Sequence, residues 1–338
     1  MVLACAAPNR SAATALDLHP SGQVLVVGTM LKQAYGAEIH LIDVDSGLRR
    51  LVHTEQSHGR QTFVHSVLFD AAGDGLVYAL NEETRHLDLE TGATRVLAGY
   101  QQWRTSDFNP FCLRPGWDAA RRRLLVFEAG DRVRVLDMVS GDVLHEVVAK
   151  DRGECRAGAL SRSGRLLALR FGPYGCGVAG VQIEIWDVDT GTLTRTLRGP
   201  FPAGVKDIGF DPQERWVVAN GEYVEGPFAI DIATDTLAWA APAPTAPAPP
   251  ATAPPATIPT GDPGHRRTCY AWDYAPDGAT LAIGGRGEIV LLDAQTRAPA
   301  AIQPSWLGTG RTGRVVYSAD GRLVAAGGDS GRITVCAV

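Results

Sequence analysis

The sequence predicts an all-β fold in which a four-stranded unit is repeated seven times. The first observation is a recurring strand that ends in an aspartate and runs into a turn rich in Asp, Ser, Thr and Gly. Its copies are "IHLIDVDSG" (39–47), "TRHLDLETG" (84–92), "VRVLDMVSG" (133–141), "IEIWDVDTG" (183–191), "PFAIDIATD" (227–235) and "IVLLDAQTR" (289–297). The intervals between their aspartates are 45, 49, 50, 44 and 62 residues, so all but one are nearly constant.

The second observation is another motif, which precedes each copy of the first. Its copies are "LDLHPSGQVLVVG", "VLFDAAGDGLVYA", "GALSRSGRLLALR", "IGFDPQERWVVAN", "WDYAPDGATLAIG", "VVYSADGRLVAAG" and the divergent "RPGWDAARRRLLVF". Each has two β-rich runs around a Pro, Ser, Asp or Gly turn, which is typical of a tight hairpin. Two hairpins in about 45 residues is the period of a propeller blade. We therefore expect a seven-bladed β-propeller of four-stranded blades.

Particular residues add a family resemblance to this period. The segment "GHRRTCYAWDYAPDG" (264–278) has a Gly-His opening and a strand that ends in a Pro-Asp-Gly turn, and Trp186-Asp187 forms a Trp-Asp dipeptide at the repeated aspartate. In these features the chain resembles the WD-repeat (WD40-repeat) β-propellers, with degenerate repeats over nearly its whole length. The resemblance implies a ring that binds proteins or peptides rather than an enzyme.

Ring closure is expected from the N-terminus. The seventh copy stops at "ITVCAV" (333–338) after three strands, and an unpaired edge strand promotes aggregation. We expect residues 2–8 to supply the missing strand, as similar propellers do. Cys5 and Cys336 would then lie on adjacent strands, either packed as free thiols or joined in a disulfide.

Composition limits the class of protein. The 338 residues are 45% hydrophobic and 20% charged, as in a globular chain, and the net charge of −5 argues against general nucleic-acid binding. The sequence has no apolar run near the ~20 residues of a membrane helix, and its first residues lack a signal-peptide pattern. The six cysteines and eight histidines lack metal-site spacing. We expect a soluble, cytoplasmic protein that is monomeric by itself and has no cofactor or metal.

One segment departs from the repeat. Residues 241–263 hold nine of the 21 prolines and fall within the anomalous interval of 62 residues. Such a composition cannot form a packed core. We expect a single domain over residues 1–338, with 241–263 as a Pro/Ala/Thr-rich loop inserted between blades five and six.

The irregular loops are the expected binding surface. The turns within each repeated motif are short and uniform, whereas the connections at the opposite ends of the strands are long and varied, and binding residues concentrate in such loops. Aromatic residues and arginines are enriched in protein interfaces. The candidate partner-binding residues are Lys32, Tyr35, Trp103, Arg104, Phe108, Tyr174, Tyr223, Arg286, Trp306 and Arg332.

A second candidate surface is the mouth of the central channel, where the first strands of the blades begin. Aligned there are His65, Arg114, Arg156, Lys206 and Arg314. If these residues converge, they form a positive mouth that could accept an acidic peptide or a phosphate group. The alternative is that Asp17, Asp207 and Asp273 neutralise them in place.

The repeated aspartates have a structural interpretation. An Asp before an Asp-Thr-Gly turn usually accepts backbone hydrogen bonds that hold the turn. The sequence contains no nucleophile elbow or phosphate-binding loop, so no catalytic residue is assigned. The sequence thus favours a non-catalytic protein- or peptide-binding scaffold. The alternatives are a propeller enzyme or small-molecule binder with its site at the central channel, and an accessory subunit that stabilises a larger complex.

Overall fold

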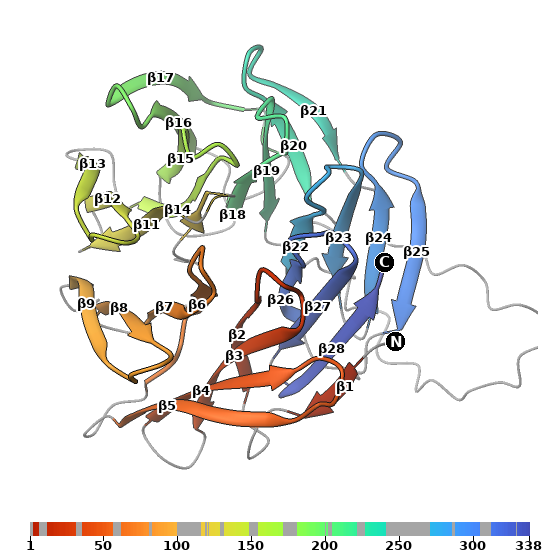
Figure 1. Ribbon diagram of the computed structural model, residues 1–338. Helices are drawn as coiled ribbons and strands as arrows, with labels where there is room; N and C mark the ends of the chain where they lie inside the picture. Colours follow the sequence, from red (N-terminus) through yellow and green to blue (C-terminus); the bar gives the residue numbers. More distant parts are fainter. Residues whose placement is uncertain are drawn as a thin grey trace, which may run out of the picture.

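The computed structural model confirms the seven-bladed β-propeller. Seven four-stranded antiparallel sheets are arranged in a ring (Figure 1). The structure describes residues 3–6, 12–31, 36–56, 62–80, 83–99, 116–118, 120, 122–128, 132–148, 155–171, 181–199, 201, 205–221, 227–240, 271–285, 288–304, 312–328 and 330–338. Among these residues, no helix is both long and apolar enough to cross a lipid bilayer.

The first four blades follow the chain in order. Blade 1 contains β2 (Ala12–Leu18), β3 (Val24–Leu31), β4 (Gly36–Asp43) and β5 (Arg49–Gln56). Blade 2 contains β6 (Ser66–Phe69), β7 (Gly75–Ala79), β8 (Glu83–Asp88) and β9 (Thr94–Gly99). Blade 3 contains β10 (Gly116–Trp117), β11 (Arg123–Glu128), β12 (Arg132–Asp137) and β13 (Val143–Val148). Blade 4 contains β14 (Cys155–Leu160), β15 (Leu166–Phe171), β16 (Gln182–Asp187) and β17 (Thr192–Leu197).

The remaining blades complete the ring. Blade 5 contains β18 (Val205–Phe210), β19 (Trp216–Gly221), β20 (Phe228–Asp231) and β21 (Thr236–Ala240). Blade 6 contains β22 (Ala271–Tyr274), β23 (Thr280–Gly284), β24 (Glu288–Asp293) and β25 (Pro299–Pro304). Blade 7 contains β26 (Thr312–Tyr317), β27 (Leu323–Gly328), β28 (Arg332–Ala337) and β1 (Leu3–Ala6). In each blade the first strand lies toward the centre of the ring and the fourth lies on the rim (Figure 1).

The N-terminal strand closes the ring, as the sequence predicts. Strand β1 pairs antiparallel with β28, with Leu3 opposite Val335 and Cys5 opposite Ile333. Cys5 and Cys336 lie on adjacent strands, but both are free thiols. Cys5 packs with Ile333 in the cluster between blades 7 and 1, while Cys336 packs in the cluster between blades 6 and 7. The two thiols therefore face opposite sides of blade 7, and packing is their role.

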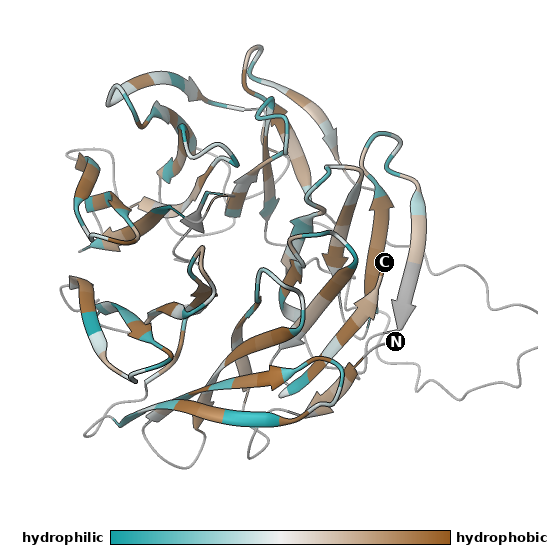
Figure 2. Ribbon diagram, viewed as in Figure 1, coloured by the Kyte–Doolittle hydropathy of each residue, from teal (hydrophilic) through white to brown (hydrophobic). Residues whose placement is uncertain are grey.

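The hydrophobic core lies between the blades. The strands alternate so that one set of side chains meets the preceding blade and the other set meets the next, and Figure 2 shows hydrophobic strands joined by hydrophilic turns. One cluster joins Val27 of blade 1 to Val335 of blade 7, and another joins Ile185 of blade 4 to Ile208 of blade 5. Each blade is therefore stable only with its neighbours.

A glycine near the end of the second strand permits this close packing in several blades. A Cβ atom on Gly28 would lie 2.5 Å from Val64 Cγ1, and one on Gly284 would lie 2.4 Å from Thr312 Cγ2. A Cβ on Gly327 would lie 2.7 Å from Leu16 Cδ2. The repeated glycine in "LVVG", "LAIG" and "VAAG" thus makes room for the first strand of the next blade.

The repeated aspartates hold the turns between third and fourth strands, which confirms their structural interpretation. In all six copies the carboxylate accepts the backbone N–H three residues later, at 2.7–3.0 Å; the acceptors are Asp43, Asp88, Asp137, Asp187, Asp231 and Asp293. These hydrogen bonds lower the pKa of each of these carboxyls, for Asp187 to about 2. The residue four places after the aspartate has a positive φ, for example 67° at Gly191, so glycine is favoured there.

The predicted insertion lies outside the described residues. Blade 5 ends with β21 at Ala240 and blade 6 begins with β22 at Ala271. Residues 241–263 fall between these two strands, and their expected lack of packing stays a prediction.

Candidate binding surface

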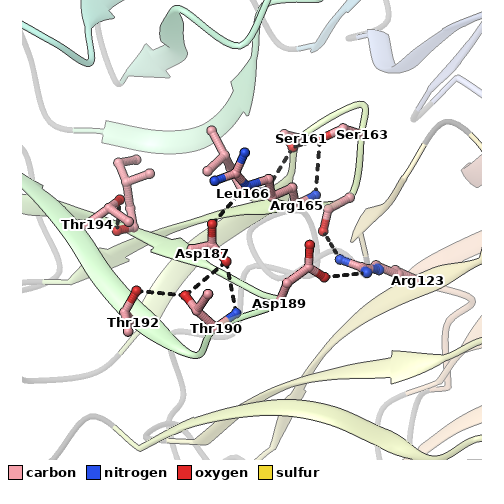
Figure 3. A network of polar contacts seen from close by, with 12 residues as sticks. Arg123, Ser161, Ser163, Arg165, Leu166, Asp187, Asp189, Thr190, Thr192 and Thr194 are labelled. Carbon is pink, nitrogen blue, oxygen red and sulfur yellow. Dashed lines mark hydrogen bonds and ion pairs between the residues drawn. The ribbon is translucent and has the colours of Figure 1, made fainter.

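The turns on one face of the ring form a bonded polar network. The strands are antiparallel, so the first-to-second and third-to-fourth turns of each blade lie at the same face. Figure 3 shows this face at blades 3 and 4: Arg165 Nε donates to Asp187 at 2.8 Å, and Arg123 donates to Asp189 at 2.6 Å. Arg123 also donates to the carbonyl oxygen of Gly164 at 2.7 Å. These groups use their hydrogen bonds within the ring, which stabilises the turns.

Two aspartates, Asp17 buried and Asp273 half-buried, link first strands of neighbouring blades near the centre of the ring. Asp17 on β2 accepts the backbone N–H of Phe69 on β6, and Asp273 on β22 accepts that of Tyr317 on β26, both at 2.9 Å. The same bond recurs at two blade junctions, which indicates a structural role. Burial, with a smaller contribution from repulsion by Asp17, raises the pKa of Asp273 to about 7.

Arg314, a predicted channel-mouth residue, lies in this inner region. Its Nη2 donates to Ser66 Oγ at 3.3 Å, which joins blade 7 to blade 2 past the first strand of blade 1. Its positive charge also stabilises the Asp273 carboxylate and so moderates the rise of that pKa. Whether an acidic neighbour neutralises Arg314 in place stays open, as the sequence left it.

The other predicted mouth residues are described only in part. His65 is 7% exposed, and its ring lies 5.8 Å from that of Phe63, so it is largely buried. The backbones of Arg156 and Lys206 lie in the first strands β14 and β18. Arg114 lies outside the described residues. Convergence of these residues into a positive mouth stays a prediction.

The predicted loop residues fall almost entirely outside the described part of the chain. Arg332 is exposed at the start of β28, where its backbone N–H donates to Ser330 Oγ at 3.3 Å. The residues outside the described ranges are Lys32, Tyr35, Trp103, Arg104, Phe108, Tyr174, Tyr223, Arg286 and Trp306. The described strands before and after them have the ends concerned at the face opposite the bonded turns.

Sequence reasoning missed a polar and aromatic cluster at the junction of blades 5 and 6. It contains Trp216, Trp239, Tyr274 and Arg297. The available signal was Arg297, which ends "DAQTR" where four other copies of the turn end in glycine. No group of three or more metal-ligating side chains that could hold an ion occurs within the described ranges.

The ring of blades and its bonded turns define the class of protein: a seven-bladed β-propeller. No protein-family model matches the sequence, and no curated protein matches it. Among solved structures, the chain is similar to a chain of the "Crystal Structure of Mitotic Checkpoint Complex", with a TM-score of 0.69 and 15% sequence identity. The match covers 99% of this chain and 91% of the other. At this identity the likeness shows the fold.

Proposed function

We propose that the chain is a divergent WD-repeat protein that acts as a non-catalytic scaffold. It binds a protein or peptide, with an acidic segment as the favoured ligand, on the face with irregular loops and at the channel mouth. We further propose that it is cytoplasmic and monomeric by itself.

The observation that carries this proposal is the contrast between the two faces. The turn aspartates and arginines are bonded within the ring, as Asp187 is to Thr190 and Arg165. The sequence expectation assigns the long connections, with their aromatic and basic residues, to the opposite face. A likeness to a chain from a multiprotein assembly is consistent with this role.

A small-molecule or catalytic site at the centre of the ring is the second candidate. Asp273 favours it, because a carboxyl with a pKa of about 7 is the kind of group that active sites use. The scaffold interpretation is stronger because Asp273 accepts the backbone N–H of Tyr317 in the same way that Asp17 accepts that of Phe69.

The test is affinity purification from the native host with face-specific variants. The loop variant combines Arg104→Glu and Arg286→Glu with Trp103→Ala and Tyr174→Ala, and the control carries Ser46→Ala and Thr190→Ala in the bonded turns. The control is expected to lose some stability, because both hydroxyls donate to turn aspartates. We expect the loop variant to lose its partners with an unchanged melting temperature and the control to keep them. The opposite pattern would place the site on the turn face.

A further inference from the structure

The blade 5–6 junction contains two indole rings at nearly a right angle. Trp216 at the start of β19 and Trp239 in β21 have ring centroids 6.5 Å apart and an interplanar angle of 76°. Trp239 and Tyr274 of β22 both pack on the hydrophobic cluster of blade 6. We call Trp216, Trp239 and Tyr274 the aromatic box. All three side chains are half-buried, so the box reaches the molecular surface.

The guanidinium of Arg297, from the blade 6 turn, occupies this box. Its Cζ atom lies 4.2 Å from the ring centroid of Trp239 and 5.3 Å from that of Trp216, within the range of cation–π attraction. Its Nε and Nη1 atoms are buried and have no hydrogen-bond partner among the described residues. Among the described residues, the two aromatic faces are thus the contacts recorded for this cation.

The position of Arg297 in the repeat makes this arrangement unusual. The equivalent residue in four other described turns is glycine with a positive φ, whereas Arg297 adopts a φ of 64°, which strains a residue with a side chain. Blade 5 has Asp235 there, but its carboxylate accepts the backbone N–H groups of Arg198 and Gly199. Arg297 has no comparable bond, so its contribution is a positive charge on the aromatic box.

Two carboxylates near the box attract a cation. Burial lowers the pKa of Arg297, and the negative charges of Asp293 and Asp211 offset part of this shift. Arg215, which is exposed, places its Cζ atom 5.1 Å from the ring centroid of Trp216, so this indole attracts two guanidinium groups. An arginine side chain on a surface turn can leave the box by rotation about its own bonds and regain hydration.

We propose that the aromatic box is a recognition site for a soft cation on a partner protein, either a methylated lysine or an arginine, and that Arg297 is an internal plug. The proposal rests on the protein-binding function above and adds to it a second contact site, at the face of the bonded turns, where Trp216 and Arg297 lie. A methylated ammonium group fits because π faces and nearby carboxylate charge, which need no N–H donor, act on the resident cation. The partner's cation must displace Arg297, so the apparent affinity equals the intrinsic affinity multiplied by the fraction of molecules in which the box is open.

The plug is tested by comparing the full chain with Arg297→Ala, which empties the box, and Arg297→Met, which fills it without charge. The probes are peptides that carry one trimethyllysine, one arginine or one acetyllysine, titrated with tryptophan fluorescence as the readout. We expect Arg297→Ala to bind a cationic probe about tenfold more tightly than the wild type does, in line with the strength of a desolvated cation–π contact. Arg297→Met and the acetyllysine peptide should show no such gain.

Whether the cationic probe binds in the aromatic box is tested in the Arg297→Ala background. Trp239→Phe should weaken binding and Trp239→Leu should abolish it, because the attraction follows the ring quadrupole. Preference for the trimethyllysine or the arginine peptide identifies the source of the cation. Equal affinity of Arg297→Ala and wild type, or full binding by folded Trp239→Leu, would overturn the proposal. Partner capture by folded Trp239→Leu in the same affinity purification would show that the scaffold function stands without the box.

Discussion

Replacing Asp273 by Asn should stabilise the protein at neutral and alkaline pH. The folded-state pKa of Asp273 is raised from 3.8 to about 7, so the folded protein holds a proton on this carboxyl that the unfolded chain has lost between about pH 4 and pH 7. The contribution of Asp273 to the unfolding free energy therefore falls as the pH rises from about 4 to about 7, and it is constant at higher pH. Asn is neutral throughout, and its Oδ1 atom can still accept the backbone N–H of Tyr317.

The magnitude follows from the shift. Each pKa unit corresponds to ~1.4 kcal/mol of unfolding free energy. The shift of about three units therefore corresponds to about 4 kcal/mol when the carboxyl is ionised in both the folded and the unfolded state. The side chain of Asp273 keeps part of its surface exposed, so water reduces the cost of the charge, and we expect about 1–3 kcal/mol. The charged groups that face it are Asp17, which raises its pKa, and Arg314, which lowers it.

The assay is urea unfolding of the wild type and Asp273→Asn at pH values between 4 and 8. The difference in unfolding free energy should be near zero at pH 4 and should grow to its full value near pH 8. Asp17→Asn in the wild-type background should move the pH dependence of Asp273 to lower pH, because it removes a like charge. A difference between variant and wild type that is constant over this pH range would refute the reasoning.

Three further changes test the fold. Deleting residues 1–9 should sharply lower the melting temperature or solubility, because β28 then becomes an unpaired edge; a truncated chain that melts like the full one would exclude β1 as the closing strand. Replacing residues 243–260 by a short Gly/Ser linker should leave circular dichroism and melting nearly unchanged, and loss of soluble protein would mean that the segment packs. Gly28→Ala should cost about 1–3 kcal/mol in urea unfolding, since its Cβ would meet Val64 Cγ1 at 2.5 Å, while Gly92→Ala, with open space, should suffer only the backbone strain of a φ of 72°.

The fold was predictable from the period of the repeat, because the residues that hold each turn are close together in the sequence. Asp43 and Asp187 bond to residues within three positions along the chain, so their role follows from local sequence. Strand register is different, because it depends on pairing between distant segments. The sequence placed Cys5 and Cys336 on adjacent strands, but only the pairing of Cys5 with Ile333 shows that the two thiols face opposite sides.

The candidate binding residues were less predictable because they depend on what surrounds them across a blade junction. Arg314 was predicted as part of a positive mouth from its place in the repeat, but its electrostatic effect on Asp273, which is 41 positions earlier in the chain, depends on the packing of blade 6 against blade 7. Arg297 was not predicted as a site residue, because the repeat is recognised by its aspartate and Arg297 lies four places after Asp293. Its significance depends on Trp216 and Trp239, which belong to another blade.

Departures from the repeat therefore carry information that the repeat itself does not. At the fourth position after the aspartate, Gly47, Gly92, Gly141 and Gly191 all adopt the positive φ of the turn. The two described turns that lack glycine both direct a charged side chain to the preceding blade, Asp235 to the end of β17 and Arg297 to the aromatic box. Asp235 satisfies backbone donors there and so fastens blade 4 to blade 5. Arg297 satisfies none, which is why the blade 5–6 junction, rather than the blade 4–5 junction, has the properties of a site that can open.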